Sequence, residues 1–177
     1  MSQKGVTLIE LLVVTSIVII IMVVVFPNYQ NAKGQLLLDR AANKLSQDIR
    51  RAGEMAMSAR MYGSPAEVPA GYGIYAVSGS TTYILYADNK NSNVGRYDGS
   101  DGLVETITLE AGVKINDVGV CAGNVSVNYR PPIPLVKISC DGGASEKGEI
   151  IITLSITSQP WKTRAVKANI AGLVDVN

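Results

Sequence analysis

The sequence predicts an α+β protein in which a long N-terminal α-helix packs on an antiparallel β domain with two sheets. Three features of the 177-residue chain indicate this architecture. An uncharged, strongly apolar run opens the chain, apolar residues at helical spacing follow it, and short β-rich runs separated by turns occupy the rest. The first two features would form the helix, and the third would form the domain that covers one of its faces.

The apolar run from Leu11 to Ala32 is 22 residues long and carries no charge. As an α-helix it would be about 33 Å long, enough to cross the hydrocarbon core of a bilayer. Two alternatives to a membrane-spanning helix stay open. One is a buried core helix. The other is a cleaved secretory signal, for which Lys4 would supply the basic start, although no A-x-A cleavage pattern follows the run.

Glu10 is an acidic residue near the start of this run. A carboxylate inside a bilayer costs about 2.5–3.5 kcal/mol on insertion scales, so such residues usually have a partner. No basic residue follows before Lys33. If the chain were cut after Gly5, the new α-amine of Val6 could pair with Glu10 of a neighbouring helix and set the register between the two. Alternatively, Glu10 lies in the membrane interface and reaches the headgroups.

The segment KGVTLIELLVV, residues 4–14, resembles the class III leader of type IV pilins and type II secretion pseudopilins. This resemblance implies that a prepilin peptidase cleaves between Gly5 and Val6, that the α-amine of Val6 is methylated, and that Glu10 directs assembly. The family usually has Phe after the cleavage site, where this chain has Val6. Pro27 falls where many members have a helix-bending proline, and we expect it to kink the helix rather than end it.

Four later segments resemble, in order, the globular domain of minor pseudopilins of the H and FimT-like type: YGIYAV, TTYILYADNKNSNVGRYDGSD, ETITLEAGVKI and KANIAGLVDV. The resemblance implies a pilin-like fold and a minor pilin or pseudopilin that helps initiate or cap a type II secretion pseudopilus or a type IV pilus. Its partners would be other pilins, the prepilin peptidase and the bacterial inner membrane, which it would cross once with its globular domain outside the cytoplasm. The alternative is a DNA-binding minor pilin of a DNA-uptake pilus.

The expected organisation has four parts: a leader at residues 1–5, a transmembrane and assembly half of the helix at 6–33, an amphipathic half at 34–62 and a globular β domain at 63–177. The amphipathic half is predicted by apolar residues three and four positions apart. These are Leu38, Ala41, Leu45, Ile49, Ala52, Ala56 and Ala59. Such a stripe would pack against the domain and leave the opposite, charged face in solvent.

Turn-forming residues in GSPAEVPAGYG, residues 63–73, mark the start of the domain. Nine β-rich runs follow, and several alternate between apolar and polar residues. They are Tyr72–Val77, Thr81–Ala87, Glu105–Leu109, Val113–Ile115, Asn124–Tyr129, Leu135–Ser139, Glu149–Thr157, Thr163–Ile170 and Leu173–Val176.

The composition argues against enzymatic function. The chain has 16 Lys and Arg against 15 Asp and Glu, which favours neither a nucleic-acid-binding nor an acidic, disordered protein. It has no His, the commonest general base and metal ligand, and no G-x-S-x-G motif. We therefore expect no catalytic residues, no metal site and no cofactor.

Cys121 and Cys140 are the only cysteines. Because the leader implies export, and thiols oxidise outside the cytosol, we expect them to form a disulfide. They flank two predicted strands, and a hairpin would bring its two ends together. Two buried thiols are the alternative.

The segment DNKNSNVGRYDGSD is rich in side-chain oxygen atoms. Its oxygen-bearing residues could gather on a calcium ion: Asp88, Asn91, Asn93, Asp98 and Asp101. The spacing departs from an EF-hand loop, because Lys90 intrudes and Gly95 is out of step. A plain exposed loop uses the same residue types and is the favoured interpretation.

Lys162 and Arg164 alternate beside Trp161, so period two places both on one face of a strand, with Lys167 opposite. Basic groups beside an aromatic ring can bind DNA, which is the basis of the DNA-uptake alternative. Two cations on one face are too few to bind DNA strongly. A solvated edge strand is the simpler interpretation of this segment.

Overall fold

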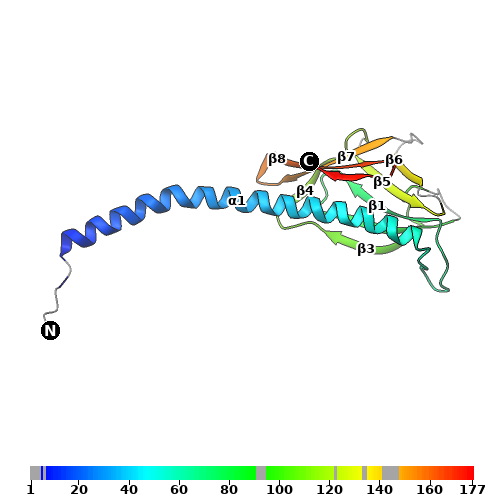
Figure 1. Cartoon of the computed structure of the whole chain (residues 1–177), viewed down its shortest axis with the longest axis horizontal. Helices are drawn as coiled ribbons and strands as arrows, with labels where there is room; N and C mark the ends of the chain where they lie inside the picture. Colours follow the sequence, from blue (N-terminus) through cyan, green and yellow to red (C-terminus); the bar gives the residue numbers. More distant parts are fainter. Residues whose placement is uncertain (1–4, 6, 91–94, 122, 133–134, 141–147) are drawn as a thin grey trace. The chain divides into compact units, whose positions relative to one another are not determined.

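The computed structural model describes residues 5, 7–90, 95–121, 123–132, 135–140 and 148–177, without the side chains of residues 27, 28, 30 and 31. Within these ranges the chain forms one long helix, α1 (Leu8–Met57), and nine strands (Figure 1). The chain divides into two compact units, Met1–Leu36 and Leu37–Asn177. The helix contributes to both units.

The nine strands form two antiparallel sheets, which confirms the predicted α+β class. The five-stranded sheet has the order β3-β2-β1-β5-β6, and the four-stranded sheet has the order β4-β7-β8-β9. The strands are β1 (Gly71–Val77), β2 (Thr82–Asp88), β3 (Gly102–Thr108), β4 (Val113–Asp117), β5 (Asn124–Arg130), β6 (Leu135–Cys140), β7 (Glu149–Ile156), β8 (Gln159–Asn169) and β9 (Val174–Val176).

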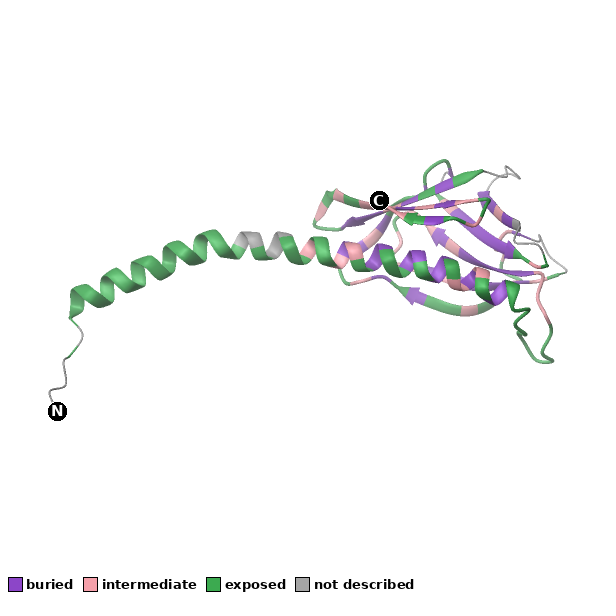
Figure 2. Cartoon of the chain, in the orientation of Figure 1, coloured by how far each residue is buried: buried purple, intermediate pink, exposed green. Residues whose placement is uncertain are grey.

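The C-terminal half of α1 buries one face in the core of the second unit, as the purple stripe in Figure 2 shows. The buried side chains recur at spacings of three and four: Leu38, Ala41, Ala42, Leu45, Ile49, Ala52, Met55 and Ala56. This is the predicted stripe with one exception, because Ala59 is exposed and lies beyond the end of the helix.

Ala59 ends the helix through its backbone conformation. Its φ of 47° is in the left-handed region, which L-residues other than glycine seldom adopt. The amide of Ala59 donates to the carbonyl of Ala56 (3.1 Å), and the amide of Arg60 donates to the carbonyl of Met55 (3.2 Å). These two bonds form a Schellman motif, which satisfies the last carbonyls of the helix.

The five-stranded sheet faces α1 with the apolar side chains of alternate residues, among them Tyr72, Tyr83 and Val127. Tyr83 on β2 also donates its hydroxyl to Oδ2 of Asp48 on the helix (2.6 Å). Burial, followed by the bond to Asp48, raises the pKa of the Tyr83 hydroxyl, so the phenol keeps its proton and acts as the donor. This bond fixes the helix against the sheet.

The strand β8 departs from regular pairing near its start. Ser155 of β7 pairs with Thr163, whereas the next residue, Ile156, pairs with Gln159. Residues 160–162 therefore have no Cα partner in the described pairing of β7 with β8. The segment bulges from the end of the hairpin and carries Trp161, which is 75% exposed.

Candidate functional site

The first 19 residues of α1, Leu8–Phe26, are predominantly apolar and exposed. Leu8–Phe26 comprises 19 residues with a mean hydropathy of 3.1, and none of the segment is buried within the described structure (Figure 2). A helix of this length rises about 28 Å, close to the roughly 30 Å of a bilayer's hydrocarbon core. By length and composition the segment can therefore cross a membrane.

Two hydroxyl groups interrupt this apolar surface, and both are satisfied within the helix. Thr15 Oγ1 and Ser16 Oγ each donate to the carbonyl oxygen of Leu12, at 3.0 and 2.8 Å. Because lipid chains offer no hydrogen-bond partner, internal bonds of this kind lower the cost of placing a hydroxyl in a membrane. The hydroxyl groups of Thr15 and Ser16 are thus compatible with lipid.

Glu10 lies in the first turn of α1, three residues after Thr7, which caps the helix. The amide of Glu10 donates to Thr7 Oγ1 (3.3 Å), and the amide of Leu11 donates to the Thr7 carbonyl (3.2 Å). Thr at the cap with Glu three residues later is the capping-box pattern, and a carboxylate also suits the positive end of the helix dipole. The pattern T-x-x-E could have predicted this role of Thr7 from the sequence alone.

The other residues expected from the leader motif are only partly described. Gly5 is exposed, whereas Val6 lies outside the described residues, so its cleavage and methylation stay predictions. The helix continues through Pro27 without ending there. The expected kink at Pro27 also stays a prediction.

Cys121 and Cys140 form the predicted disulfide. Their Cα atoms are 5.2 Å apart, and both residues are buried. Cys140 ends β6 in the five-stranded sheet, whereas Cys121 follows β4 of the four-stranded sheet. The disulfide therefore joins the connection before β5 to the end of β6, so it links the two ends of the β5–β6 hairpin, as expected.

The loop after β2 covers the face of the five-stranded sheet that points away from the helix. Its described part donates the Gly95 amide to Asp88 Oδ2 (2.6 Å) and the Tyr97 amide to Ser126 Oγ (3.0 Å). Ser139 donates its hydroxyl back to the Gly95 carbonyl (3.1 Å). The loop thus buries polar side chains that would otherwise lie on an open sheet surface.

Asp88 is fully buried beneath this loop. Asn128 donates its amide to Asp88 Oδ2 (3.0 Å), but Oδ1 of Asp88 and Oδ1 of Asn128 have no hydrogen-bond partner within the described structure. Burial raises the pKa of Asp88 to about 6, against the opposing effect of the Gly95 amide. Gly71 leaves the space for this cluster, because a Cβ there would lie 2.8 Å from Asn128 Oδ1.

The loop residues considered as calcium ligands serve the loop itself. Asp101 accepts hydrogen bonds from two loop amides (2.8 Å each), and Asp98 accepts them from the amide and hydroxyl of Ser100 (2.8 and 2.6 Å). Such bonds are typical of Asx turns. Asn91 and Asn93 lie outside the described residues. Among the residues that the structure does describe, no group of three or more His, Cys, Asp or Glu side chains could hold a metal ion.

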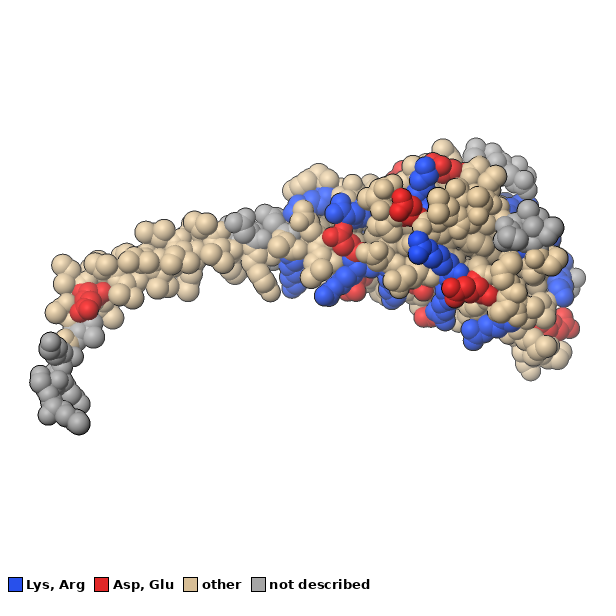
Figure 3. All heavy atoms as spheres, in the orientation of Figure 1, with Lys and Arg blue, Asp and Glu red and all other residues tan. Residues whose placement is uncertain are grey.

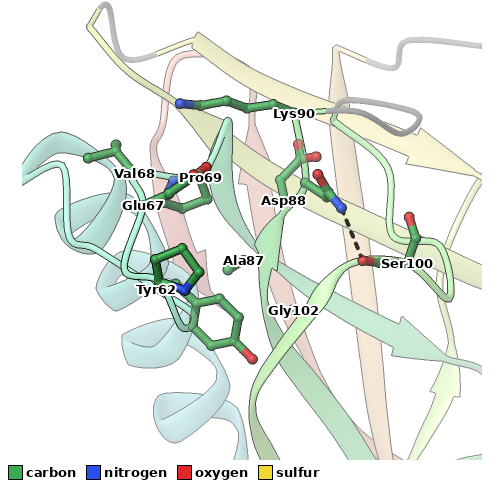
Figure 4. Close-up of a pocket in the computed structure, with 11 residues that line it drawn as sticks. Tyr62, Glu67, Val68, Pro69, Ala87, Asp88, Lys90, Ser100 and Gly102 are labelled. Carbon is green, nitrogen blue, oxygen red and sulfur yellow. Dashed lines mark hydrogen bonds between the residues drawn. The ribbon is translucent and has the colours of Figure 1, made fainter.

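A pocket of about 390 Å³ opens between the turns that follow α1 and the ends of β2 and β3 (Figure 4). Tyr62 forms one wall, where its hydroxyl donates to the Leu103 carbonyl (2.9 Å) and its ring leaves room for no side chain at residue 102. Glu67 and Lys90 bring charges of both signs to the lining. The described lining pairs no nucleophile with a histidine base, since the sequence has no His.

Arg164 lies in the paired part of β8, whereas Lys162 lies in the bulge, where the alternation is interrupted. Arg164 alternates with the buried Val166 and Ala168, and its side chain is 43% exposed. Arg164 Nε forms an ion pair with Asp39 Oδ1 of α1 at 2.5 Å. Because a carboxylate already holds Arg164, that guanidinium is less available to a DNA phosphate than an unpaired one.

Compared with models of protein families, with curated proteins and with solved structures, the chain matches none of them.

Proposed function

We propose that the protein is a minor pilin or pseudopilin, a structural subunit that helps initiate or cap a type II secretion pseudopilus or a type IV pilus. The observation that carries the proposal is the exposed apolar segment Leu8–Phe26 with one carboxylate in its first turn. A bilayer would cover this surface before assembly, and a bundle of like helices would cover it in the filament.

The charge of Glu10 favours assembly over simple anchoring. A permanent anchor needs only the apolar surface, and a glutamine would satisfy the capping box equally well. The carboxylate adds a cost in lipid that a cationic partner would offset. Removal of the leader after Gly5 would create such a partner in the α-amine of Val6 on a neighbouring subunit. The apolar helix surfaces alone could pack well in several axial registers. The pair between Glu10 and this α-amine would select one of these registers.

Three variants separate assembly from capping. Glu10→Ala should insert in the membrane and lose its leader normally, because the segment becomes more apolar, but it should not enter the filament. Glu10→Gln keeps a hydrogen-bonding side chain and loses the charge, so it should enter poorly. Thr7→Ala keeps the charge and loses the cap, at about 1 kcal/mol of helix stability, so it should still enter.

The measurement is crosslinking to the major filament subunit, beside an immunoblot of the membrane fraction for processing. Normal incorporation of Glu10→Ala would contradict the proposal, and the carboxylate would then be an interfacial group. Mass spectrometry of the mature N-terminus gives a separate check, with a methylated Val6 as the expected first residue. A chain that begins beyond Phe26 would instead indicate an ordinary signal peptide.

A further inference from the structure

Trp161 is the only tryptophan of the chain and is 75% exposed. It lies in the bulge of β8, between Gln159 and Thr163, where the pairing with β7 is interrupted. A soluble domain gains little from a large aromatic side chain in water, since burial of that side chain would stabilise it. An exposed tryptophan on a protruding hairpin therefore suggests contact with something outside the domain.

The contacts of β8 show at which end of the second unit this hairpin lies. Arg164 pairs with Asp39, in the first turn of the helix within this unit. Farther along, Arg50 donates to the carbonyl of Val174, which pairs with Ala168 of β8. The strand and the helix thus run in the same direction. Residues before 164 extend toward the end where the helix enters the unit, where Figure 1 shows the hairpin of β8.

The chain tethers this end of the second unit to the membrane-spanning candidate. Asp39 follows Phe26, the last residue of the membrane-spanning candidate, by 13 residues of α1. That stretch of helix rises about 20 Å, which is the length of the tether between Phe26 and the second unit.

Two segments at this end, residues 37–44 and 159–164, carry more basic than acidic residues, while Glu110 lies in the nearby turn before β4. Only one acidic residue, Asp39, lies in the helix segment 37–44 and the hairpin segment 159–164, and it is paired with Arg164. The same segments hold four basic residues: Arg40, Lys44, Lys162 and Arg164. Figure 3 shows Lys and Arg side chains around this end of the globular unit. Tryptophan favours the interface of a bilayer, and basic residues near a membrane favour anionic lipids.

We propose that Trp161, with Arg40, Lys44 and Lys162, docks on the anionic phospholipid headgroups of the membrane that holds Leu8–Phe26. The contact would hold the globular unit against the membrane while the subunit waits for assembly. This inference rests on the membrane-spanning part of the proposed function and is independent of the filament.

The full chain in lipid vesicles provides the test, because all tryptophan fluorescence comes from Trp161. In vesicles that contain phosphatidylglycerol, we expect a blue-shifted emission, quenching by lipids brominated near the headgroup, and acrylamide quenching reduced about threefold relative to phosphatidylcholine vesicles. Emission typical of tryptophan in water, with full acrylamide quenching and no effect of brominated lipid, would overturn the proposal.

A matched reporter excludes general adsorption of the domain. The double variant Trp161→Phe with Leu173→Trp moves the tryptophan to a 66% exposed position just before β9, beyond the opposite end of β8. It should be quenched by acrylamide and not by brominated lipid. Equal lipid quenching of both reporters would contradict a specific contact of the hairpin.

A charge variant tests the role of the headgroups. Lys162→Glu with Arg40→Glu should return the emission of Trp161 to that seen with phosphatidylcholine, whereas unchanged emission would contradict an electrostatic contact. Flotation of the vesicles reports membrane insertion separately. A chain that fails to float would overturn the membrane-spanning helix itself rather than the role of Trp161.

Discussion

Asp88 combines complete burial with an incomplete set of hydrogen-bond donors. Its Oδ2 accepts from Gly95 and Asn128, while its Oδ1 has no partner in the described structure. A carboxylate in such a place is stabilised by taking up a proton, because the neutral acid loses less hydration on burial and gains a donor. The Oδ1 atom of Asn128, also without a described partner, is an acceptor in the same cluster.

The first prediction concerns the pH dependence of stability. The pKa of Asp88 is raised from 3.8 to about 6 in the folded state, so the folded state binds this proton more tightly than the unfolded chain does. The resulting stabilisation is complete below about pH 3.8 and is lost as the pH rises through about 6. The free energy of unfolding should therefore be lower at pH 8 than at pH 5 by about 1 kcal/mol.

Urea denaturation of a fragment with residues 35–177 measures this difference. The fragment contains every residue of the buried core, from Leu38 to Val174. The sequence has no His, so no side chain with an ordinary pKa titrates between pH 5 and 8. Asp88→Asn should abolish the pH dependence and stabilise the fragment at pH 8, whereas Asp175→Asn, on an exposed carboxylate, should leave it unchanged. Equal pH dependence in both variants would contradict a buried, protonated Asp88.

The type of a residue can be read from the sequence, whereas the atoms that surround it in the fold cannot. Asp88 was predicted as one of the oxygen-bearing groups of an exposed loop, yet it is buried, because the loop folds back over the sheet. The pairing of Cys121 with Cys140 was predictable, since only two cysteines exist. The bond from Arg164 to Asp39 spans 125 positions, and no local pattern indicates it.

Among the elements, the helix differs most from its expected bounds at its C-terminal end. The amphipathic stretch was expected to reach residue 62, just before Gly63, whereas α1 ends at Met57. Helices commonly end at a glycine in the left-handed conformation, and here Ala59 takes that place. An alanine gives no stop signal in the sequence and favours continuation of a helix.

This helix end provides the second stability prediction. Ala59→Gly should stabilise the fragment by about 1 kcal/mol, because glycine adopts the left-handed conformation without steric cost. Glu54→Gly, at an exposed position inside the helix, should instead destabilise it by about 1 kcal/mol. Urea denaturation tests these opposite effects, because the midpoint should rise for Ala59→Gly and fall for Glu54→Gly. A lower midpoint for Ala59→Gly would show that residue 59 is not strained in solution.

The strands were predictable where apolar and polar residues alternate and less so where pairing is irregular. The expected strands Tyr72–Val77 and Asn124–Tyr129 agree with β1 and β5 within one residue. In contrast, β8 was expected from Thr163 and begins at Gln159. Pro160 and the bulge beside it break the alternation there, so the expected strand did not include the residues before Thr163.

For the whole molecule, one helix meets two different environments. Leu8–Phe26 is exposed on every side, whereas the buried core begins at Leu38 and draws on α1 and both sheets. Because no residue of the apolar segment belongs to the core, the fold of the second unit does not depend on that segment. The fold of the second unit is therefore separable from any membrane contact of Leu8–Phe26.

The last prediction follows from this separation. A fragment of residues 35–177 should be a soluble, folded monomer, whereas the full chain should require detergent or lipid, because its exposed apolar segment would otherwise associate. Light scattering coupled to gel filtration gives the mass, and a cooperative urea transition shows the fold. Within the fragment, Ile49→Asp should abolish cooperative unfolding, because it places a charge at a fully buried position that faces the sheets. Lys44→Asp introduces the same residue on the exposed face of the same helix and should fold normally. A fragment that aggregates without detergent, or two variants that unfold alike, would show that the apolar half of α1 contributes to the fold after all.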